Sequence, residues 1–498
     1  MFSSIPSAVL LGARGHRVAV EVHVAKGLPG FHVVGLPDDS IREARDRVRA
    51  AVMSAGAVWP DIKVTVNLAP SMQRKSGSGL DLAIAVGVLA SSGQIPLAAI
   101  EGLAFFGELG LDGSTRDVPG AAPMAGVLGE LDLVVPVANA VEASMISAGR
   151  VRAVGHLGEL VSVLANAAPW PNHDVVADAA APAPTADLAD VIGQPVARYA
   201  LEIAAAGGHH LLFVGPPGAG KTMLAARLPG LLPDLDPAEA LEATMIHSAA
   251  GLPLPGGGLV MRPPFRAPHH TSSEVAMVGG GSHSLRPGEV SLAHRGVLFM
   301  DELPEFAPRV MDTLRQPLES GEVRVSRAAL HVTIPSRFQL VAAMNPCPCG
   351  EGNRPGYCEC GDARMRKYVS RISGPLIDRF DLRVGVEPPD VDELLSHHRN
   401  EATSVAAARG AGARRRALQR QGHRNAELDA AGLDEVAPLS SGALRLLRNQ
   451  LEAGKLSARG YHRVRRVART IVALAAARPA TSAAPTELDA PDVALAQS

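Results

Sequence analysis

The sequence predicts an α/β protein in which a parallel β-sheet leads into a helical C-terminal region, and three observations predict this class. Between residues 187 and 390, short apolar runs alternate with helical segments and Gly/Pro-rich loops, as in β-α-β units. From residue 391 to 498 the apolar spacing is mostly helical. Residues 1–166 mix short strands with helices, so we expect them to form a separate α+β domain.

The individual elements are predicted from their periodicity and their capping residues. Residues 17–24 read as a strand, and residues 39–55 have a helical period that begins with acidic and Ser capping residues. Residues 167–186 are rich in Ala, Pro and Asp and have no apolar period, which is typical of a linker. In the last region, residues 440–452 and 459–477 are predicted helices.

The composition excludes several classes of protein. A net charge of −2 gives no overall attraction to nucleic acid, so any basic surface must be local. No apolar run is long enough to span a membrane, and the N-terminus lacks the basic stretch of a signal peptide. Four cysteines in 498 residues do not suit a secreted disulfide scaffold. We therefore expect a cytoplasmic protein without a membrane partner.

A phosphate-binding loop is the clearest motif. Residues 210–214 resemble a buried strand, and a helical segment follows at 223–228. Between them lie Gly215, Pro216, Pro217, Gly218, Ala219, Gly220, Lys221 and Thr222. Backbone N–H groups of such a loop surround phosphates, and the following helix dipole favours their charge. We expect Lys221 to reach the β- and γ-phosphates of ATP and Thr222 to bind Mg²⁺.

Two further apolar strands end in polar residues. Residues 296–300 precede Asp301 and Glu302, and residues 338–344 precede Asn345. Asp301 is suited to hold Mg²⁺, and Glu302 to activate the attacking water. Asn345 can contact the γ-phosphate or the water if its strand lies beside that of Asp301. The alternatives are solvated acids at a strand end and, for Asn345, a turn cap before a proline.

The cysteines form one cluster, which contains Cys347, Cys349, Cys358 and Cys360. Four thiolates can bind one Zn²⁺ tetrahedrally, and such a closed ligand set indicates a structural zinc rather than a catalytic one. The C-x-C spacing is less usual than C-x-x-C, so unliganded thiols and redox sensing are the alternatives. Because the cluster follows Asn345, we expect it to stiffen a loop near the hydrolysis site.

Several longer motifs carry a family resemblance. Residues 288–303, 314–321 and 373–381 resemble the magnesium-chelatase-like AAA+ ATPases. The ComM/YifB subfamily of that group is similar over nearly the whole chain. The motifs that carry this closer resemblance are GLPD at 35–38, FRAPHH at 265–270, AMNPCPC at 343–349 and LSARGYHR at 456–463. The resemblance implies an AAA+ P-loop module with a helical lid.

The resemblance also implies roles for polar residues around the ATP. Asn345 resembles the first sensor, and Arg379 resembles an arginine finger that reaches the γ-phosphate of a neighbouring subunit. Without the family, Arg379 reads as a salt bridge beside a strand. Arg459 resembles the second sensor on the lid, with Arg463 one helical turn later as the alternative. A finger that acts on a neighbour requires a ring, and the family implies a homo-hexamer.

The family resemblance extends to the adenine and to the pore of the ring. Val191 and Ile192 lie in the segment 190–194, which matches the one that packs against adenine. Segments 265–285 and 322–336 match inserts that line the central pore in such rings.

Residues 1–166 resemble the Lon-protease-like domain of the same subfamily, through KSGSGLD at 75–81 and GELGLDG at 107–113. A Lon-type site needs a Ser nucleophile that a Lys activates. In this alignment the Ser position falls on Gly79, and the Lys position falls near Ala122. Ser76 and Ser78 lie nearby, but with Lys75 adjacent in sequence they form no credible dyad. We therefore expect an inactive scaffold domain.

The implied function is an ATP-driven motor that translocates single-stranded or branched DNA in recombination or natural transformation. Two clusters of arginines are candidate phosphate contacts, and a solvated helix face is the alternative for both. They contain Arg414, Arg415, Arg416, Arg420 and Arg424 in one cluster, and Arg459, Arg463, Arg465, Arg466 and Arg469 in the other. The alternative functions are a chelatase-type motor subunit that drives Mg²⁺ into a porphyrin, and a Lon-like ATP-dependent protease.

Overall fold

The structure is a computed structural model of the 498-residue chain. It describes all residues except 71–74, 76, 174–185, 256–257, 282–284, 328–329, 353–356, 396–399, 478–486 and 498. Ser76 and most of the predicted linker at 167–186 therefore lie outside the described residues, as do small parts of the two predicted inserts. The predicted domain boundaries stay predictions. Within the described ranges, no helix is long and apolar enough to cross a membrane.

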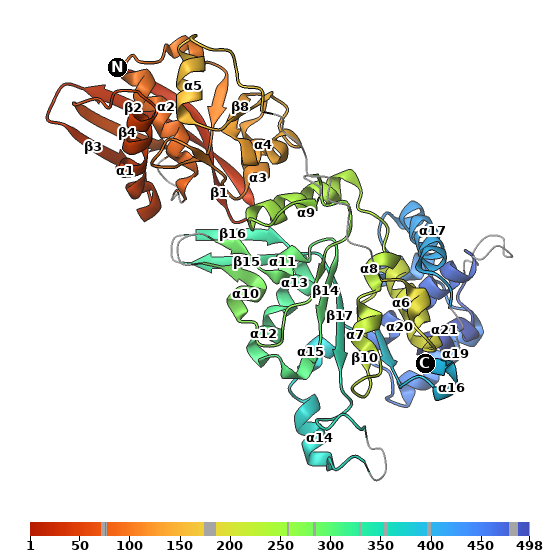
Figure 1. Ribbon diagram of the computed structural model, residues 1–498. Coiled ribbons are helices and arrows are strands. Elements are labelled where there is room, and N and C mark those ends of the chain that lie inside the picture. The colour runs from red at the N-terminus through yellow and green to blue at the C-terminus, as the bar shows by residue number, and fades with distance from the viewer. Residues whose placement is uncertain are drawn as a thin grey trace.

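The N-terminal region begins with a four-stranded sheet in the order β1-β2-β4-β3 (Figure 1). Its strands are β1 (Phe2–Leu11), β2 (Arg14–Ala25), β3 (Gly30–Val34) and β4 (Lys63–Ala69). The sheet packs on α1 (Asp39–Ser54) and α2 (Asp81–Ser91), and α2 is buried along its whole length. Asp38 caps α1 by accepting a hydrogen bond from the N–H of Ile41. The strand predicted at 17–24 and the helix predicted at 39–55 are confirmed.

A second, smaller sheet completes the N-terminal region. Its three parallel strands have the order β5-β8-β9. The elements of this part are β5 (Leu103–Phe105), β6 (Glu108–Leu109), β7 (Thr115–Arg116), α3 (Ala121–Leu128), β8 (Asp132–Pro136), α4 (Val137–Ser144), β9 (Val151–Val154) and α5 (Leu157–Leu164). The mixture of antiparallel and parallel strands agrees with the predicted α+β class.

A five-stranded, wholly parallel sheet forms the centre of the chain, in the order β11-β14-β17-β10-β18. Its strands are β10 (Leu211–Val214), β11 (Phe265–Arg266), β14 (Val297–Met300), β17 (Gln339–Met344) and β18 (Leu382–Gly385). The last residues of all five strands meet at one edge, which we call the carboxyl edge. The opposite edge, where the strands begin, is the amino edge. The predicted parallel sheet is confirmed.

Helices cover both faces of this sheet, so its central strands are apolar on both sides. Along β10, Leu211 and Phe213 pack in one core cluster, and Leu212 packs in the other. The remaining elements of this region are α6 (Pro195–Gly207), α7 (Lys221–Ala225), α8 (Leu228–Leu231), α9 (Pro237–Ala249), α10 (Glu274–Val278), β12 (Gly279–Gly280), β13 (Arg286–Pro287), α11 (Glu289–Leu292), α12 (Pro308–Thr313), α13 (Arg315–Ser320), β15 (Glu322–Arg327), β16 (Leu330–Pro335), α14 (Asp362–Val369) and α15 (Gly374–Ile377).

The C-terminal region is helical, as predicted. Its helices are α16 (Val391–Leu395), α17 (Thr403–Gln421), α18 (Ala430–Val436), α19 (Ser441–Glu452), α20 (Ala458–Ala475) and α21 (Ala490–Gln497). Ser440 and Ser457 cap α19 and α20 through their hydroxyl oxygens, which fixes where these two helices begin. The helix α20 packs against α6 of the sheet region and against α21. The lid is thereby held on the side of the sheet that ends in β18 (Figure 1).

The N-terminal region contacts the sheet region through α9 and the β15–β16 hairpin (Figure 1). The N–H groups of Gly120 and Ala122 donate to the carbonyl and the hydroxyl of Ser248, at 2.9 Å and 3.3 Å. Ala13, in the turn after β1, shares an apolar cluster with Ile334 of β16. The predicted insert at 322–336 therefore forms a hairpin that supports the N-terminal region.

Candidate functional site

The phosphate-binding loop runs from β10 into α7 at the carboxyl edge, in the predicted strand–loop–helix order. Its geometry requires glycine at Gly215 and favours glycine at Gly218 and Gly220. A Cβ on Gly215 would lie 2.0 Å from the carbonyl oxygen of Val386, so only glycine fits there. Gly220 has a φ of +89°, in the left-handed region that favours glycine, and it is the N-cap that precedes α7. The loop is therefore bent tightly, with the N-terminus of α7 at the site.

The buried side chain of Lys221 ties the loop to the neighbouring strand. Its Nζ donates to the carbonyl oxygens of Gly215 and Pro216 at 2.7 Å and 2.8 Å, and to Oδ1 of Asn345 at 3.0 Å. Burial lowers the pKa of Lys221, while the nearby charges of Asp301 and Glu302 oppose that change. Asn345 reaches Lys221 because β17 lies directly beside β10 in parallel register.

Asp301 lies at the same edge, one strand further along the sheet. Its Oδ2 accepts a hydrogen bond from the hydroxyl of Thr222 at 2.5 Å, and its Oδ1 accepts from the backbone N–H of Glu302 at 2.9 Å. A hydroxyl and a carboxylate oxygen are the hard ligands that Mg²⁺ takes together with phosphates. Thr222 and Asp301 can therefore hold Mg²⁺ as the sequence predicted.

Glu302 follows in an unusual backbone conformation. Its φ of +53° lies in the left-handed region, which non-glycine residues seldom adopt outside turns and functional sites. Its side chain is 57% exposed, and Oε2 lies 3.1 Å from Nδ1 of His270. The sequence alone indicates no role for His270. His270 belongs to the FRAPHH motif at 265–270. The local sequence does not show that the strand in this motif, β11, lies beside β14.

The segment predicted to contact adenine packs beside the loop. Val191 is fully buried, and its carbonyl accepts a hydrogen bond from Asn400 at 2.6 Å. Ile192 is half-buried. Gln194 donates to the carbonyl of Ala219 within the phosphate-binding loop, at 3.4 Å. The structure thus brings all of the predicted loop, strand-end and adenine-side residues to one edge of the sheet.

Arg379, Arg459 and Arg463 lie elsewhere. They line a cavity of about 780 Å³ together with His210, Gln339 and Asp381, which stand at the starts of β10, β17 and β18. This basic cavity is therefore at the amino edge. Its charged lining consists of Arg337, Arg379, Arg424, Arg459, Arg463 and Arg466 against Glu319, Asp378, Asp381 and Glu427. Six guanidinium groups face four carboxylates, so the cavity carries a net positive charge.

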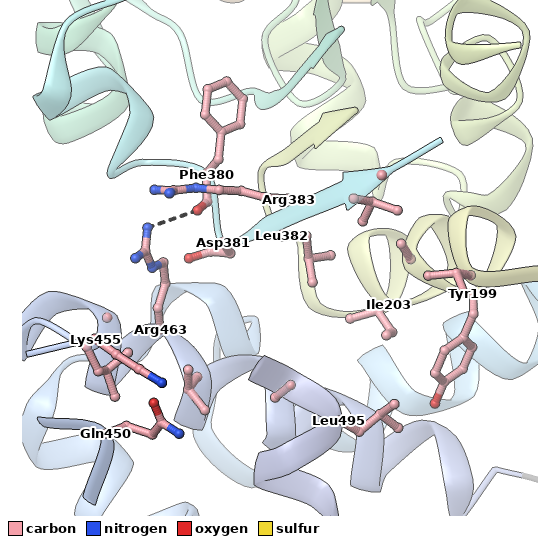
Figure 2. Close-up of a pocket in the computed structure, with 18 residues that line it drawn as sticks. Tyr199, Ile203, Phe380, Asp381, Leu382, Arg383, Gln450, Lys455, Arg463 and Leu495 are labelled. Carbon is pink, nitrogen blue, oxygen red and sulfur yellow. Dashed lines mark hydrogen bonds between the residues drawn. The ribbon is translucent and has the colours of Figure 1, made fainter. Parts of the chain in front are cut away.

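Individual contacts fix two of these arginines. Arg379 pairs with Glu319 of α13, so it makes a salt bridge of the kind that sequence analysis gave as its alternative. Its side chain is still 33% exposed toward the cavity. Arg463 donates to the carbonyl oxygens of Phe380 and Asp378 at 3.1 Å and 3.3 Å. Figure 2 shows the contact with Phe380 at the start of β18.

A second cavity, of about 450 Å³, follows β18 between the sheet and the lid (Figure 2). Tyr199, Ile203 and Leu495 give it an apolar end, and Lys455 and Arg463 give it a polar end. Arg463 of α20 lines both cavities. The amino edge of the sheet lies about 13 Å, the length of β10, from the phosphate-binding loop.

The two arginine clusters are used largely in packing. Arg414 and Arg416 donate to carbonyl oxygens of Ala205 and Ala473, and Arg465 is only 3% exposed, with contacts to Asp434 and to backbone. Burial lowers the pKa of Arg414 to about 9. These guanidinium groups stabilise the packing of the lid. For both clusters, apart from the residues that line the basic cavity, this favours a structural role over contact with nucleic acid.

The four cysteines come together as predicted, and their sulfur atoms lie within 4.8 Å of one another. The Sγ of Cys347 is 3.2 Å from that of Cys349 and 3.8 Å from that of Cys358. Four thiolates around a tetrahedral zinc at 2.3 Å stand about 3.8 Å apart, so the cluster fits the ion. A Cβ on Gly350, within this loop, would lie 2.6 Å from Pro217. The cysteine loop thus packs directly on the phosphate-binding loop.

The candidate protease residues of the N-terminal region do not form a described dyad. Lys75 is 1% exposed and donates to the carbonyl of Pro70, whereas the hydroxyl of Ser78 donates to Glu108. Ser76 lies outside the described residues. The N–H of Ala122 donates to Glu142. The likeness to a Lon-type domain and its inactivity stay predictions.

Comparisons with known proteins agree on one group. Residues 187–394 match the family "Magnesium chelatase, subunit ChlI", residues 20–139 match "Subunit ChlI of Mg-chelatase", and residues 400–484 match "Magnesium chelatase, subunit ChlI C-terminal". The chain is 46% identical to an uncharacterized protein of Mycobacterium tuberculosis, 42% to YifB of Escherichia coli and 41% to competence protein ComM of Haemophilus influenzae. These matches cover 94% of this chain and 92–94% of each relative.

Proposed function

Because the chain belongs to the ComM/YifB subfamily of magnesium-chelatase-like AAA+ proteins, we propose that it is a cytoplasmic, ATP-hydrolysing ring motor that acts on DNA. The observation that carries the proposal is the division of its polar residues between two edges of one sheet. The carboxyl edge has the loop and the acids that ATP hydrolysis needs. The amino edge has the basic cavity but no phosphate-binding loop of its own.

At the carboxyl edge, each side chain has a part in hydrolysis. Lys221 and the loop N–H groups bind the phosphates, and Thr222 and Asp301 hold the Mg²⁺ that neutralises the developing charge. Glu302 takes a proton from the attacking water, and Asn345 contacts the γ-phosphate from the adjacent strand. Val191 and Ile192 pack against the adenine.

At the amino edge, the basic cavity serves a neighbouring subunit. Arg379 lies a strand's length from its own phosphate-binding loop, so the γ-phosphate that it stabilises is the neighbour's. Arg459 and Arg463 share its cavity and act as the second sensor on the same neighbouring ATP. A contact of one edge with the opposite edge of the next copy is heterologous, and such contacts form a ring when the rotation between copies closes. The family suggests six subunits.

The cysteine loop holds a structural Zn²⁺ in this proposal. Cys347, Cys349, Cys358 and Cys360 supply four thiolates, and no open ligand position remains for catalysis. Through Gly350 and Pro217 the bound ion keeps the phosphate-binding loop in its bent form.

DNA as the substrate is supported by the likeness to a protein named for competence. The lid arginines contribute little to this part of the proposal, since most of them are engaged in packing. In the segments at 265–285 and 322–336, the residues outside β11 and outside the apolar contact with the N-terminal region are the proposed contacts in the pore.

The test is migration of a four-way DNA junction in the presence of ATP, with Lys221→Ala as the control. We expect the wild-type protein to move the junction and the variant to leave it in place. A wild-type protein that hydrolyses ATP but never moves branched or single-stranded DNA would refute the DNA part of the proposal. Stimulation of its ATPase by a porphyrin and partner subunits would indicate a chelatase motor, and ATP-dependent casein cleavage would indicate a protease.

A further inference from the structure

We propose that the outer edge of β18, the side of this strand that faces away from β10, is a docking site for an extended, acidic segment of a partner protein. The segment joins the central sheet as an additional strand. It lies in the cavity of about 450 Å³ between the sheet and the lid (Figure 2). Docking of this kind requires neither ATP nor a second copy of the chain.

The backbone of β18 is paired with another strand on one side. Among the described strands, β18 pairs with β10 alone, with Leu382 opposite Leu211 in parallel register. The N–H groups of Leu382 and Val386 donate toward β10, at 3.1 Å and 2.8 Å. Because the backbone groups of a strand alternate in direction, those of Arg383 and Gly385 point away from β10. Both of these residues line the cavity, so donors and acceptors of the strand face it.

The outer edge is open at Gly385. A Cβ on this residue would meet no atom within 4 Å, so the space beside it is open. The charged side chain of the strand, Arg383, turns back toward the preceding loop, where its guanidinium donates to the carbonyl of Ile377 at 2.9 Å. Open strand edges are places where extended peptides add to a sheet. The 4 residues of β18 can pair with about four residues of a peptide.

The charge of the cavity selects an acidic peptide. Its lining contains three cationic side chains, those of Arg383, Lys455 and Arg463, and one carboxylate, that of Asp381. The Asp381 carboxylate lies 3.2 Å from Nδ1 of His209, so it already has a partner. Within the described residues, the ammonium group of Lys455 has no ion-pair partner. The cavity therefore has an excess of positive charge that acidic side chains can neutralise.

Arg383 and Arg463 are the crowded part of this charge. Burial and the neighbouring charge of Arg463 lower the pKa of Arg383, while the charge of Asp378 opposes that change. Asp378 lies 3.8 Å from the guanidinium of Arg383, and both side chains are 44% exposed, so the pair is weak. An acidic ligand beside these guanidinium groups reduces their repulsion.

The opposite end of the cavity accommodates an apolar side chain. Tyr199 and Ile203 of α6 and Leu495 of α21 lie there, and Leu495 is 50% exposed (Figure 2). The bond from Arg463 to the carbonyl of Phe380 places the cationic end at the start of β18. Charge and apolar surface are thus separated along the strand. A small amphipathic anion could match both ends but would leave the strand edge unpaired, whereas an extended peptide matches all three features.

The probe is a fluorescein-labelled synthetic peptide in which a block of glutamates precedes a block of valines. A second peptide has the two blocks in reverse order, and a third has glutamine in place of glutamate. Fluorescence anisotropy with the full chain gives the Kd of each. We expect one of the two acidic peptides to bind saturably, since parallel and antiparallel addition need opposite orders. The glutamine peptide should bind about 10-fold more weakly or worse.

Variants test the cations and the strand edge separately. Lys455→Glu should weaken the acidic peptide about 10-fold, because it replaces an attraction by a repulsion. Its basal ATPase stays within about twofold of wild type, because Lys455 is not part of the ATP site. Lys63→Glu, a change at an exposed lysine of β4, is the matched control and keeps the wild-type Kd.

Gly385→Pro removes an outward N–H and leaves the bonds to β10 in place, so we expect about 10-fold weaker binding. Gly385→Ala keeps that N–H in an open space, so its Kd should stay within about twofold of wild type. The melting temperature of each variant shows whether it is folded. If Gly385→Pro does not fold, Lys455→Glu still tests the site.

Absence of saturable binding by both acidic peptides would overturn the inference, as would a wild-type Kd in folded Lys455→Glu protein. Decanoate is tested beside the peptides as a small amphipathic anion. If decanoate binds in a Lys455-dependent way and neither peptide does, strand addition is wrong. If the peptide binds as expected but the wild-type protein hydrolyses no ATP, the proposed function fails and the docking site stands.

Discussion

The two edges of the central sheet handle charge in different ways. At the carboxyl edge, the phosphate-binding loop brings N–H groups and one buried lysine to a compact site. The polar side chains there are hydrogen-bonded to one another or to the loop; they are Lys221, Thr222, Asp301 and Asn345. At the amino edge, six arginines surround a cavity of about 780 Å³ with four carboxylates among them. The carboxyl edge presents mainly backbone groups of the loop, and the amino edge presents mainly long arginine side chains.

In the proposed ring, this difference makes the two edges complementary. The loop supplies geometry for the phosphates but no guanidinium group for the charge that develops on the γ-phosphate. The basic cavity supplies such groups but has no loop to hold a nucleotide. In the proposed ring, two copies of the chain, placed with unlike edges together, would complete one site. The predictions below test that complementarity, from the largest expected effect to the smallest.

The largest effects distinguish binding from hydrolysis. Lys221→Ala removes the cation that contacts the phosphates, so we expect loss of both ATP binding and hydrolysis. Arg379→Ala leaves the loop intact, so we expect ATP binding to remain while kcat falls about 1,000-fold or more, as for other arginine fingers. Binding of a fluorescent nucleotide and phosphate release measure the two quantities separately.

Mixing these two inactive variants sharpens the test. In mixed rings, about a quarter of the interfaces pair an intact loop with an intact Arg379, so we expect hydrolysis to return in proportion. Arg152→Ala, a change remote from both edges, serves as the matched arginine control and retains activity. If the mixture stays as inactive as its components, although mixed rings form, then Arg379 does not act across the interface.

An intermediate effect is expected from the cysteine loop, which packs on the carboxyl edge. The wild-type protein is expected to contain about one zinc per chain, and removal of this supporting ion should weaken ATP binding about 10-fold. The reason is the packing of Gly350 against Pro217. Metal analysis and nucleotide titration check the two statements, with Cys358→Ser as a variant that lacks a full ligand set. Unchanged ATP affinity after complete zinc loss would contradict the support role.

The smallest expected effect is a loss of folding stability at low pH, which depends on His210 at the amino edge. Burial lowers the pKa of His210 to about 4 from its usual 6.5, and its Nδ1 accepts a hydrogen bond from the N–H of Leu340 at 2.9 Å. The folded state therefore holds His210 neutral, and the stability that depends on it is present above pH 6.5 and lost as the pH falls toward 4. We expect the free energy of unfolding to fall by about 1 kcal/mol per pH unit in that range from this group.

Denaturant unfolding at pH 7 and pH 5 measures this dependence. His210→Asn keeps an acceptor near Nδ1 but cannot gain a proton, so its stability should change less between the two values. An equal loss in the variant and in the wild type would show that other groups dominate the acid response.

Much of the fold could be predicted from local patterns. The apolar runs that precede Gly215, Asp301 and Asn345 became buried parallel strands, because strands covered on both faces are apolar throughout. Ser440 and Gly220 also act within a few residues of their own position. Such features depend on backbone geometry and short-range hydrogen bonds, which the sequence specifies directly.

The sequence by itself thus determined the ATP-binding motif, the element types, the gathering of four cysteines and the family. Only the tertiary structure decided which strands are neighbours, and that order has three consequences. It places His270 against Glu302, Arg379 with Arg459 and Arg463 at the edge away from Lys221, and Gly350 on Pro217. Each joins residues far apart in the chain, and their contact depends on how the sheet and lid pack. A local pattern contains no information about that packing.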